Sequence, residues 1–137
     1  MLAVAVRRVR AVADGGAVYI RESEPGVYLK SRITDCTFQS NEVFVNNTLE
    51  YGRDQWNASG GAVSIDVDRT RSASFIRNCS FHSNSLNAWN GGAIWARIDA
   101  DAYLSIRDCD FIRNTRRQVM AGHADERNNF YEEREEE

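Results

Sequence analysis

A seven-residue stretch that occurs three times constrains the fold of this chain more than any other feature of its sequence. The three copies are DCTFQSN at 35–41, NCSFHSN at 78–84 and DCDFIRN at 108–114. The chain has three cysteines, and each is the second residue of one copy. A glycine motif precedes every copy, as GGAV at 15–18, GGAV at 60–63 and GGAI at 91–94. The paired motifs define a repeat unit, and the fold must place its copies in equivalent surroundings.

The spacing of the motifs predicts a solenoid. The cysteine follows the first glycine by 21, 19 and 18 residues in successive units, and the second and third glycine motifs start 31 residues apart. The first unit is longer because of an insert at 42–59, where the second unit has only 85–90. One length-variable loop in a regular repeat is typical of solenoids that carry insertions on one face. We expect a repeat domain over 1–124, with units at about 15–59, 60–90 and 91–120.

Hydrophobic residues alternate after each glycine motif, which predicts strands. The alternating positions are Val18 and Ile20, then Val63, Ile65 and Val67, then Ile94, Ala96 and Ile98. An isoleucine also lies three residues before each cysteine, at 33, 76 and 106. Each unit therefore predicts about three short strands that stack in parallel on those of the next unit. The fold class is all-β, a parallel β-helix of about three coils, and the general preference of parallel crossovers makes it right-handed.

Each repeated residue predicts a column, because equivalent side chains in stacked parallel strands lie about 4.8 Å apart. We expect a buried cysteine column (Cys36, Cys79, Cys109), a buried phenylalanine column (Phe38, Phe81, Phe111) and an asparagine ladder at a turn (Asn41, Asn84, Asn114). The residue before each cysteine (Asp35, Asn78, Asp108) is of a type that tolerates left-handed backbone, which suits a tight bend.

The glycine motifs predict a corner of the coil. A glycine pair suits a position where φ is positive or where a side chain would collide with the neighbouring coil. The residues concerned are Gly15, Gly16, Ala17, Gly60, Gly61, Ala62, Gly91, Gly92 and Ala93.

The pairing of GGA-[VI] with F-x-x-N resembles the repeats of the chlamydial polymorphic outer membrane proteins, and related right-handed β-helix proteins of the pectin-lyase-like class share it. Three pairs are present: Gly15–Val18 with Phe38–Asn41, Gly60–Val63 with Phe81–Asn84, and Gly91–Ile94 with Phe111–Asn114. The resemblance covers roughly residues 15–114. It implies a surface-exposed β-helical passenger with a role in adhesion. The signal peptide and outer-membrane barrel of that family have no counterpart in this sequence.

The charge of the chain argues against a nucleic-acid partner, because 17 basic and 20 acidic residues leave a net charge of −3. Seven acidic residues and two arginines fall within 125–137, which we expect to be a solvated acidic tail. The sequence AGHA at 121–124 stands where a fourth glycine motif is due. No stretch is long enough to cross a bilayer, so we expect no membrane insertion by this segment.

Several residues could carry chemistry, and each also has a structural explanation. The cysteines lack the clustering that metal sites need, so we interpret them as packed thiols and expect no metal and no cofactor. His82 and His123 are interpreted as surface residues. Four carboxylates that follow the first strand of the second and third units could bind Ca²⁺ or act as acid and base if they converge with Arg97; otherwise they are turn residues. They are Asp66, Asp68, Asp99 and Asp101.

Aromatic residues and glycosylation sequons mark further candidate surfaces. The aromatic residues Trp56, Trp89, Trp95, Tyr19, Tyr51 and Tyr103 could contact carbohydrate or protein, or be singly exposed. The sequons begin at Asn46, Asn57 and Asn78, and the last of these lies in the predicted tight bend.

Three functions are compatible with this sequence. The first is a non-catalytic adhesive or structural module, secreted or at the cell surface, with a host-cell, matrix or glycan surface as its partner. The second is a carbohydrate-active enzyme or glycan-binding module of pectin-lyase-like fold. The third is a repeat fragment of a longer surface protein. In the first and third cases the chain would be a monomer or part of a larger chain.

Overall fold

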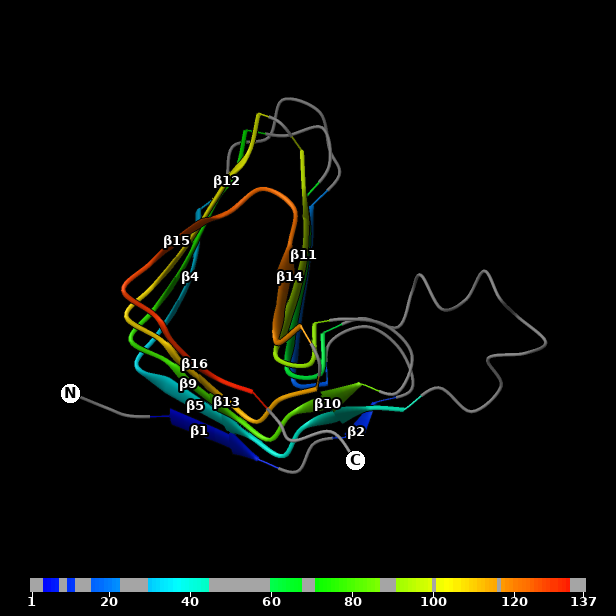
Figure 1. The fold of residues 1–137 in the computed structure, drawn as a ribbon. Helices are drawn as coiled ribbons and strands as arrows, with labels where there is room; N and C mark the ends of the chain where they lie inside the picture. The colour runs from blue at the N-terminus through cyan, green and yellow to red at the C-terminus, as the bar shows by residue number, and fades with distance from the viewer. Residues whose placement is uncertain are drawn as a thin grey trace.

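The computed structural model describes residues 4–7, 10–11, 16–22, 30–44, 60–67, 71–86, 91–99, 101–115 and 117–133. Within these ranges the chain is all-β, with no helix, and its strands pair in parallel in four stacked sheets (Figure 1). This arrangement is compatible with the β-helix that the repeat predicts.

Successive repeat units contribute strands in the same order. The first unit contains β3 (Val18–Glu22), β4 (Lys30–Thr34), β5 (Cys36–Gln39) and β6 (Glu42–Val43). The second contains β7 (Val63–Val67), β8 (Ala73–Arg77), β9 (Ser80–His82) and β10 (Ser85–Leu86). The third contains β11 (Ile94–Ile98), β12 (Tyr103–Arg107) and β13 (Asp110–Ile112). The first two units thus have a two-residue strand beyond the three expected.

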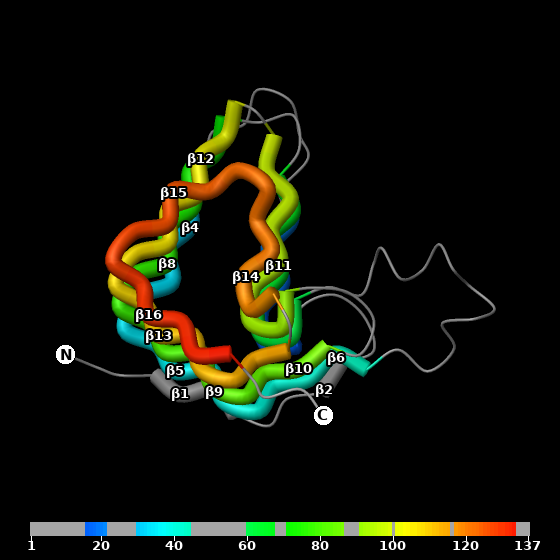
Figure 2. Tube along the Cα trace, viewed as in Figure 1, coloured from blue at the N-terminus to red at the C-terminus, as the bar shows by residue number. Residues whose placement is uncertain are grey.

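The four sheets follow the repeat. Sheet A has the order β1-β5-β9-β13-β16, sheet B β10-β6-β2, sheet C β14-β11-β7-β3 and sheet D β15-β12-β8-β4. Their registers join equivalent residues of successive units, for example Val63 with Ile94 and Phe81 with Phe111. Figure 2 looks along the stack, so that equivalent strands lie behind one another.

The N-terminal segment extends the stack. Strand β1 (Val4–Arg7) pairs with β5, and β2 (Arg10–Ala11) pairs with β6. In this register Val4 aligns with Cys36 and Val6 with Phe38.

The C-terminal segment also extends the stack, which corrects two expectations. Residues 125–132 are not an irregular tail, because β15 (Asp125–Arg127) pairs with β12 and β16 (Phe130–Glu132) pairs with β13, although most of their side chains are exposed. The sequence at 121–124 is not a fourth glycine motif either. Ala121 is the last residue of β14 (Val119–Ala121) and pairs with Ala96, so this sequence follows the first strand of the unit instead of preceding it.

Repeated apolar side chains fill the space between the sheets. One cluster joins residues of sheets A, C and D, and Val63, Ile76 and Phe81 in it are at most 1% exposed. Burial is less complete in the first unit, where Val18 and Ile33 are only partly buried. The second and third units therefore hold the centre of the core.

Candidate functional site

The repeated phenylalanines form a column of stacked rings. The ring centroids of Phe38 and Phe81 are 4.9 Å apart with an interplanar angle of 9°, and those of Phe81 and Phe111 are 5.0 Å apart at 7°. Tyr131 continues the column, since its ring lies 5.2 Å from that of Phe111 at 11°. The three phenylalanines are at most 1% exposed, whereas Tyr131 is 44% exposed at the end of the stack. The three phenylalanines therefore build the core.

The asparagines form a buried ladder at the turn between sheets A and B. The side-chain amide of Asn41 donates to Asn84 Oδ1 (3.0 Å), and that of Asn84 donates to Asn114 Oδ1 (2.9 Å). The backbone N–H groups of Asn41 and Asn84 bond to the same two oxygens. Gln118 supplies a further rung, because its Oε1 accepts from the Asn114 amide at 2.7 Å while its own amide donates to the Glu132 carbonyl. The ladder satisfies buried backbone groups along its length.

The cysteines form one column of free thiols, in which Cys79 and Cys109 are buried as predicted but Cys36 is only half-buried. Cys79 Sγ lies 3.5 Å from the carbonyl of Ile33, and Cys109 Sγ lies 3.8 Å from that of Ile76. In the last unit Asn129 takes the cysteine position, and its amide donates to the Ile106 carbonyl at 3.0 Å.

The surroundings disfavour ionisation of Cys36 and Cys79, whereas the hydrogen bond with Cys79 lowers the pKa of Cys109. Burial raises the pKa of Cys36, and the hydrogen bond with Cys109, together with burial, raises the pKa of Cys79. Both thiols are therefore protonated at neutral pH and are poor nucleophiles. These thiols therefore contribute packing and local hydrogen bonds.

The glycine motifs combine the two properties expected of the corner. Gly60 and Gly91 have φ values of 68° and 88°, which an L side chain rarely adopts. A Cβ on Gly61 would lie 2.0 Å from the carbonyl oxygen of Gly92, so a side chain there would collide with the next unit. Ala62 and Ala93 are fully buried. Gly15 lies outside the described residues.

The tight bend before each cysteine has left-handed backbone. Asp35, Asn78 and Asp108 have φ values of 57°, 52° and 57°, and Asn128 takes the same position in the last unit with 55°. Acids and amides alternate along this corner, and Asn78 donates to Asp35 Oδ1 at 2.7 Å. A glycan on Asn78 would replace one of the two hydrogens of this amide. The other two sequons, at Asn46 and Asn57, lie outside the described residues.

Among the carboxylates that follow the first strands, Asp66 pairs with Arg97. Asp66 on β7 is engaged by Arg97 on β11 through two hydrogen bonds of 2.9 and 3.0 Å. Asp99 accepts a bond from the backbone of Asp101 in the turn that follows β11. Asp68 lies outside the described residues. In the part of the chain that the structure describes, no three His, Cys, Asp or Glu side chains are arranged to hold a metal ion.

Of the remaining sequence candidates, the structure describes two histidines and three aromatic residues. Tyr19 and Tyr103 are 44% and 41% exposed, and Trp95 is half-buried. His82 is half-buried on β9, and His123 is exposed between β14 and β15. Trp56, Trp89 and Tyr51 lie outside the described residues.

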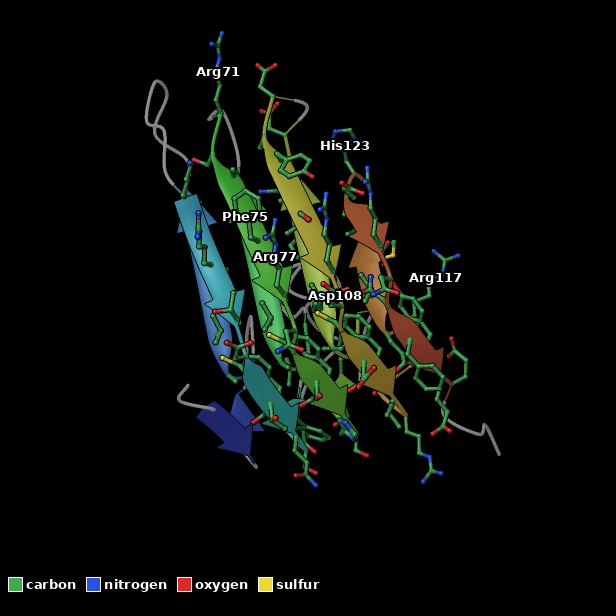
Figure 3. The ribbon with its side chains drawn as sticks, turned by 90° about the vertical axis from the view of Figure 1, so that its left-hand side faces the viewer. Arg71, Phe75, Arg77, Asp108, Arg117 and His123 are labelled. Carbon is green, nitrogen blue, oxygen red and sulfur yellow. The ribbon has the colours of Figure 1, made fainter. Side chains whose placement is uncertain are left out.

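The outer face of sheet D carries two pockets that the repeat motifs do not indicate. One, of about 100 Å³, is lined by Arg32 and Thr34 of β4 and by Phe75 and Arg77 of β8. The guanidinium carbons of Arg32 and Arg77 lie 5.7 and 5.3 Å from the centroid of the Phe75 ring, within the range of cation–π attraction. Phe75 and Arg77 share this face of β8 (Figure 3).

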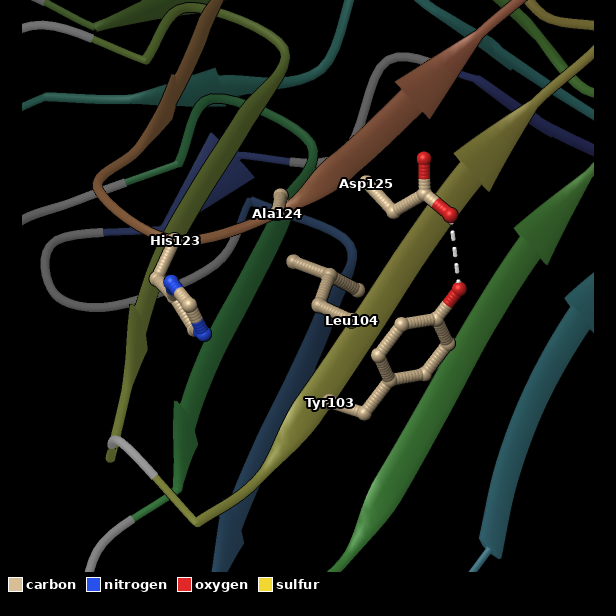
Figure 4. Close-up of a pocket in the computed structure, with 5 residues that line it drawn as sticks. All are labelled: Tyr103, Leu104, His123, Ala124 and Asp125. Atoms are coloured by element: carbon tan, nitrogen blue, oxygen red, sulfur yellow. Dashed lines mark hydrogen bonds between the residues drawn. The ribbon is translucent and has the colours of Figure 1, made fainter.

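The second pocket, of about 170 Å³, lies beside β12 and β15 and is lined by Tyr103, Leu104, His123, Ala124 and Asp125 (Figure 4). The Tyr103 hydroxyl donates to Asp125 at 2.8 Å. This hydrogen bond and those from Arg127 and Arg107 hold the pKa of Asp125 below its usual value. Asp125 is therefore ionised at neutral pH and serves as an ion-pair partner rather than as a proton donor.

Comparison of the chain with protein-family models, with curated proteins and with solved structures finds no match. Among the residues that the structure describes, no helix has the length and hydrophobicity to cross a bilayer. The function must therefore be argued from the geometry.

Proposed function

We propose that this chain is a right-handed parallel β-helix of about three coils, extended at its C-terminal end by a shorter set of strands. It acts as a non-catalytic repeat module, secreted or at the cell surface, and its role is adhesive or structural. The resemblance of its paired motifs to those of the chlamydial polymorphic outer membrane proteins supports the adhesive role.

One observation carries this proposal: the repeated motif residues serve the core, whereas two positions on the outer side of the strands differ from unit to unit. In sheet D one outward position is occupied successively by Lys30, Ala73 and Tyr103. In sheet C the register aligns Tyr19 with Ser64, Trp95 and Met120. The fold thus depends on its internal columns, and the outer surface is free to carry recognition.

Attachment assays test the adhesive role. Beads coated with the purified chain should bind cultured epithelial cells, extracellular-matrix proteins or a glycan array more than albumin-coated beads do. Beads coated with the heat-unfolded chain are the matched control, because they have the same composition without the folded surface. Attachment no greater than that of albumin on all three targets would refute the adhesive role.

A further inference from the structure

We propose that the outer face of β4 and β8 binds a carboxylate or sulfate group of an acidic polysaccharide. The residues concerned are Arg32, Thr34, Phe75 and Arg77, which we name the two-arginine site. This inference rests on the proposed function and specifies the ligand class of the adhesive surface.

The strand register assembles the two-arginine site from adjacent units. Arg32 pairs with Phe75, and Thr34 pairs with Arg77, so that the four residues form a two-by-two patch across β4 and β8. Both guanidinium groups lie against the Phe75 ring, which separates and orients them. The pocket between these side chains, about 100 Å³, has room for a small oxyanion group.

The charges of this face are unbalanced at the two-arginine site. The register places Arg77, Arg107 and Arg127 side by side on β8, β12 and β15, and like charges in opposed positions repel. Asp125 pairs with Arg107 at 3.1 Å and with Arg127 at 2.8 Å. Within the described residues, neither Arg32 nor Arg77 contacts a carboxylate. A bound anion would supply the negative charge that Asp125 supplies to the other two arginines.

The chemistry of the site selects the ligand class. A guanidinium group donates paired hydrogen bonds that match the oxygens of a carboxylate or a sulfate. The Tyr103 ring lies 6.0 Å from that of Phe75 and is 41% exposed, so an apolar surface adjoins the anion pocket. Such a surface can pack against the C–H groups of a sugar ring, which favours an acidic polysaccharide over an acidic polypeptide.

Calorimetric titration of the whole chain tests the ligand class with four probes. A hyaluronan hexasaccharide carries carboxylates only, a heparin hexasaccharide also carries sulfates, maltohexaose is neutral, and poly-L-glutamate is an acidic polypeptide. We expect binding of at least one acidic saccharide that weakens with added salt, and no binding of maltohexaose. Comparison of the two acidic saccharides separates carboxylate from sulfate recognition. Failure of both to bind, or equally tight binding of poly-L-glutamate, would overturn the proposal.

Substitutions test the residues. Arg32→Gln and Arg77→Gln should each lower the affinity about tenfold, because each removes charged hydrogen bonds to the ligand. Arg21→Gln is the matched control, since Arg21 is also an exposed strand arginine but lies on sheet C. Arg77→Lys keeps the charge and should bind with intermediate affinity. Unchanged binding by both glutamine variants, or an equal loss in Arg21→Gln, would refute the assignment, and circular dichroism of each variant verifies its fold.

The same variants separate this inference from the proposed function. Attachment that is lost in the double variant Arg32→Gln/Arg77→Gln supports both. Attachment that persists unchanged in the double variant refutes the two-arginine site and leaves the adhesive role standing. Oligosaccharide binding without attachment to cells, matrix or glycan array supports the site and refutes the adhesive role.

Discussion

The C-terminal strands pair in the same backbone register as the second and third repeat units. They differ from these units in the side chains at equivalent positions. In the second and third units, Phe81, Phe111, Cys79 and Cys109 are at most 2% exposed. At the C-terminal end Tyr131 takes the phenylalanine position, Asn129 the cysteine position and Glu126 the isoleucine position. The phenylalanine, cysteine and isoleucine columns thus each end in a residue with a polar group.

This difference shows how the internal columns end in hydrogen-bonding side chains, although Phe130 on β16 is 55% exposed. The Tyr131 hydroxyl donates to Glu126, and Asn129 donates to the hydroxyl of Tyr131. Partial burial and the bond to Glu126 raise the pKa of Tyr131, so this hydroxyl remains a donor at neutral pH. Terminal repeats of solenoids need a polar outer face for solubility, and the C-terminal strands have this character.

We expect the largest difference in stability between the second unit and the C-terminal strands in the column of stacked rings. Phe81→Ala should lower the free energy of unfolding by about 3–5 kcal/mol, because it opens a cavity between two stacked rings. Tyr131→Ala should cost about 1 kcal/mol, since it loses one stacking contact at an exposed end. Urea denaturation followed by circular dichroism measures both values. Equal losses would mean that the C-terminal strands are as much a part of the core as the second unit.

The glycines should show the next largest difference. Gly61→Ala should destabilise by about 3 kcal/mol, because the new methyl group would overlap the backbone of the next unit. Gly122→Ala, at a position where a Cβ meets nothing within 4 Å, should change stability by less than about 0.5 kcal/mol. Thermal melting of the two variants compares them directly. A tolerated Gly61→Ala would contradict the close approach of the corners.

Substitutions in the asparagine ladder should show a smaller difference in stability between the centre and the end of the stack. Asn84→Ala leaves buried partners on both sides without hydrogen bonds and should cost about 2–3 kcal/mol. Gln118→Ala should cost about 1 kcal/mol, because removal of this end rung would let water solvate the Asn114 amide. Hydrogen exchange of the Asn41 and Asn114 amides reports the two losses separately. A greater loss in Gln118→Ala would show that the ladder is anchored from its end.

We expect the smallest effect from acid, which should destabilise the C-terminal strands relative to the second unit. Because the folded-state pKa of Asp125 lies below its unfolded value, its contribution to stability is present above about pH 4 and is lost as pH falls through the folded-state pKa. Hydrogen exchange of β15 amides should therefore accelerate below that pH more than exchange in β8. Asp125→Asn should remove the difference. A difference that persists in this variant would implicate another carboxylate.

The repeat predicts most of the strand register, because residues in the same place of each unit meet across the sheets. Cys79 and Cys109 lie one strand apart for this reason, and so do Asn84 and Asn114. The last unit escaped prediction because three of its column residues differ in type. A weaker signal was present, however, since IRNCSF, IRDCDF and ERNNFY share an arginine, an Asp or Asn, and a final aromatic residue.

The sequence by itself determined the repeat, its strands, the inward columns and the positions that need glycine or left-handed backbone. These features follow from local spacing, which parallel stacking turns into contacts between like residues. Only the tertiary structure decided that Gln118 completes the ladder and that Arg32, Phe75 and Arg77 form one site. Gln118, Arg32 and Phe75 belong to no repeated motif, and their contacts depend on the path of the chain after β13 and on the pairing of β4 with β8.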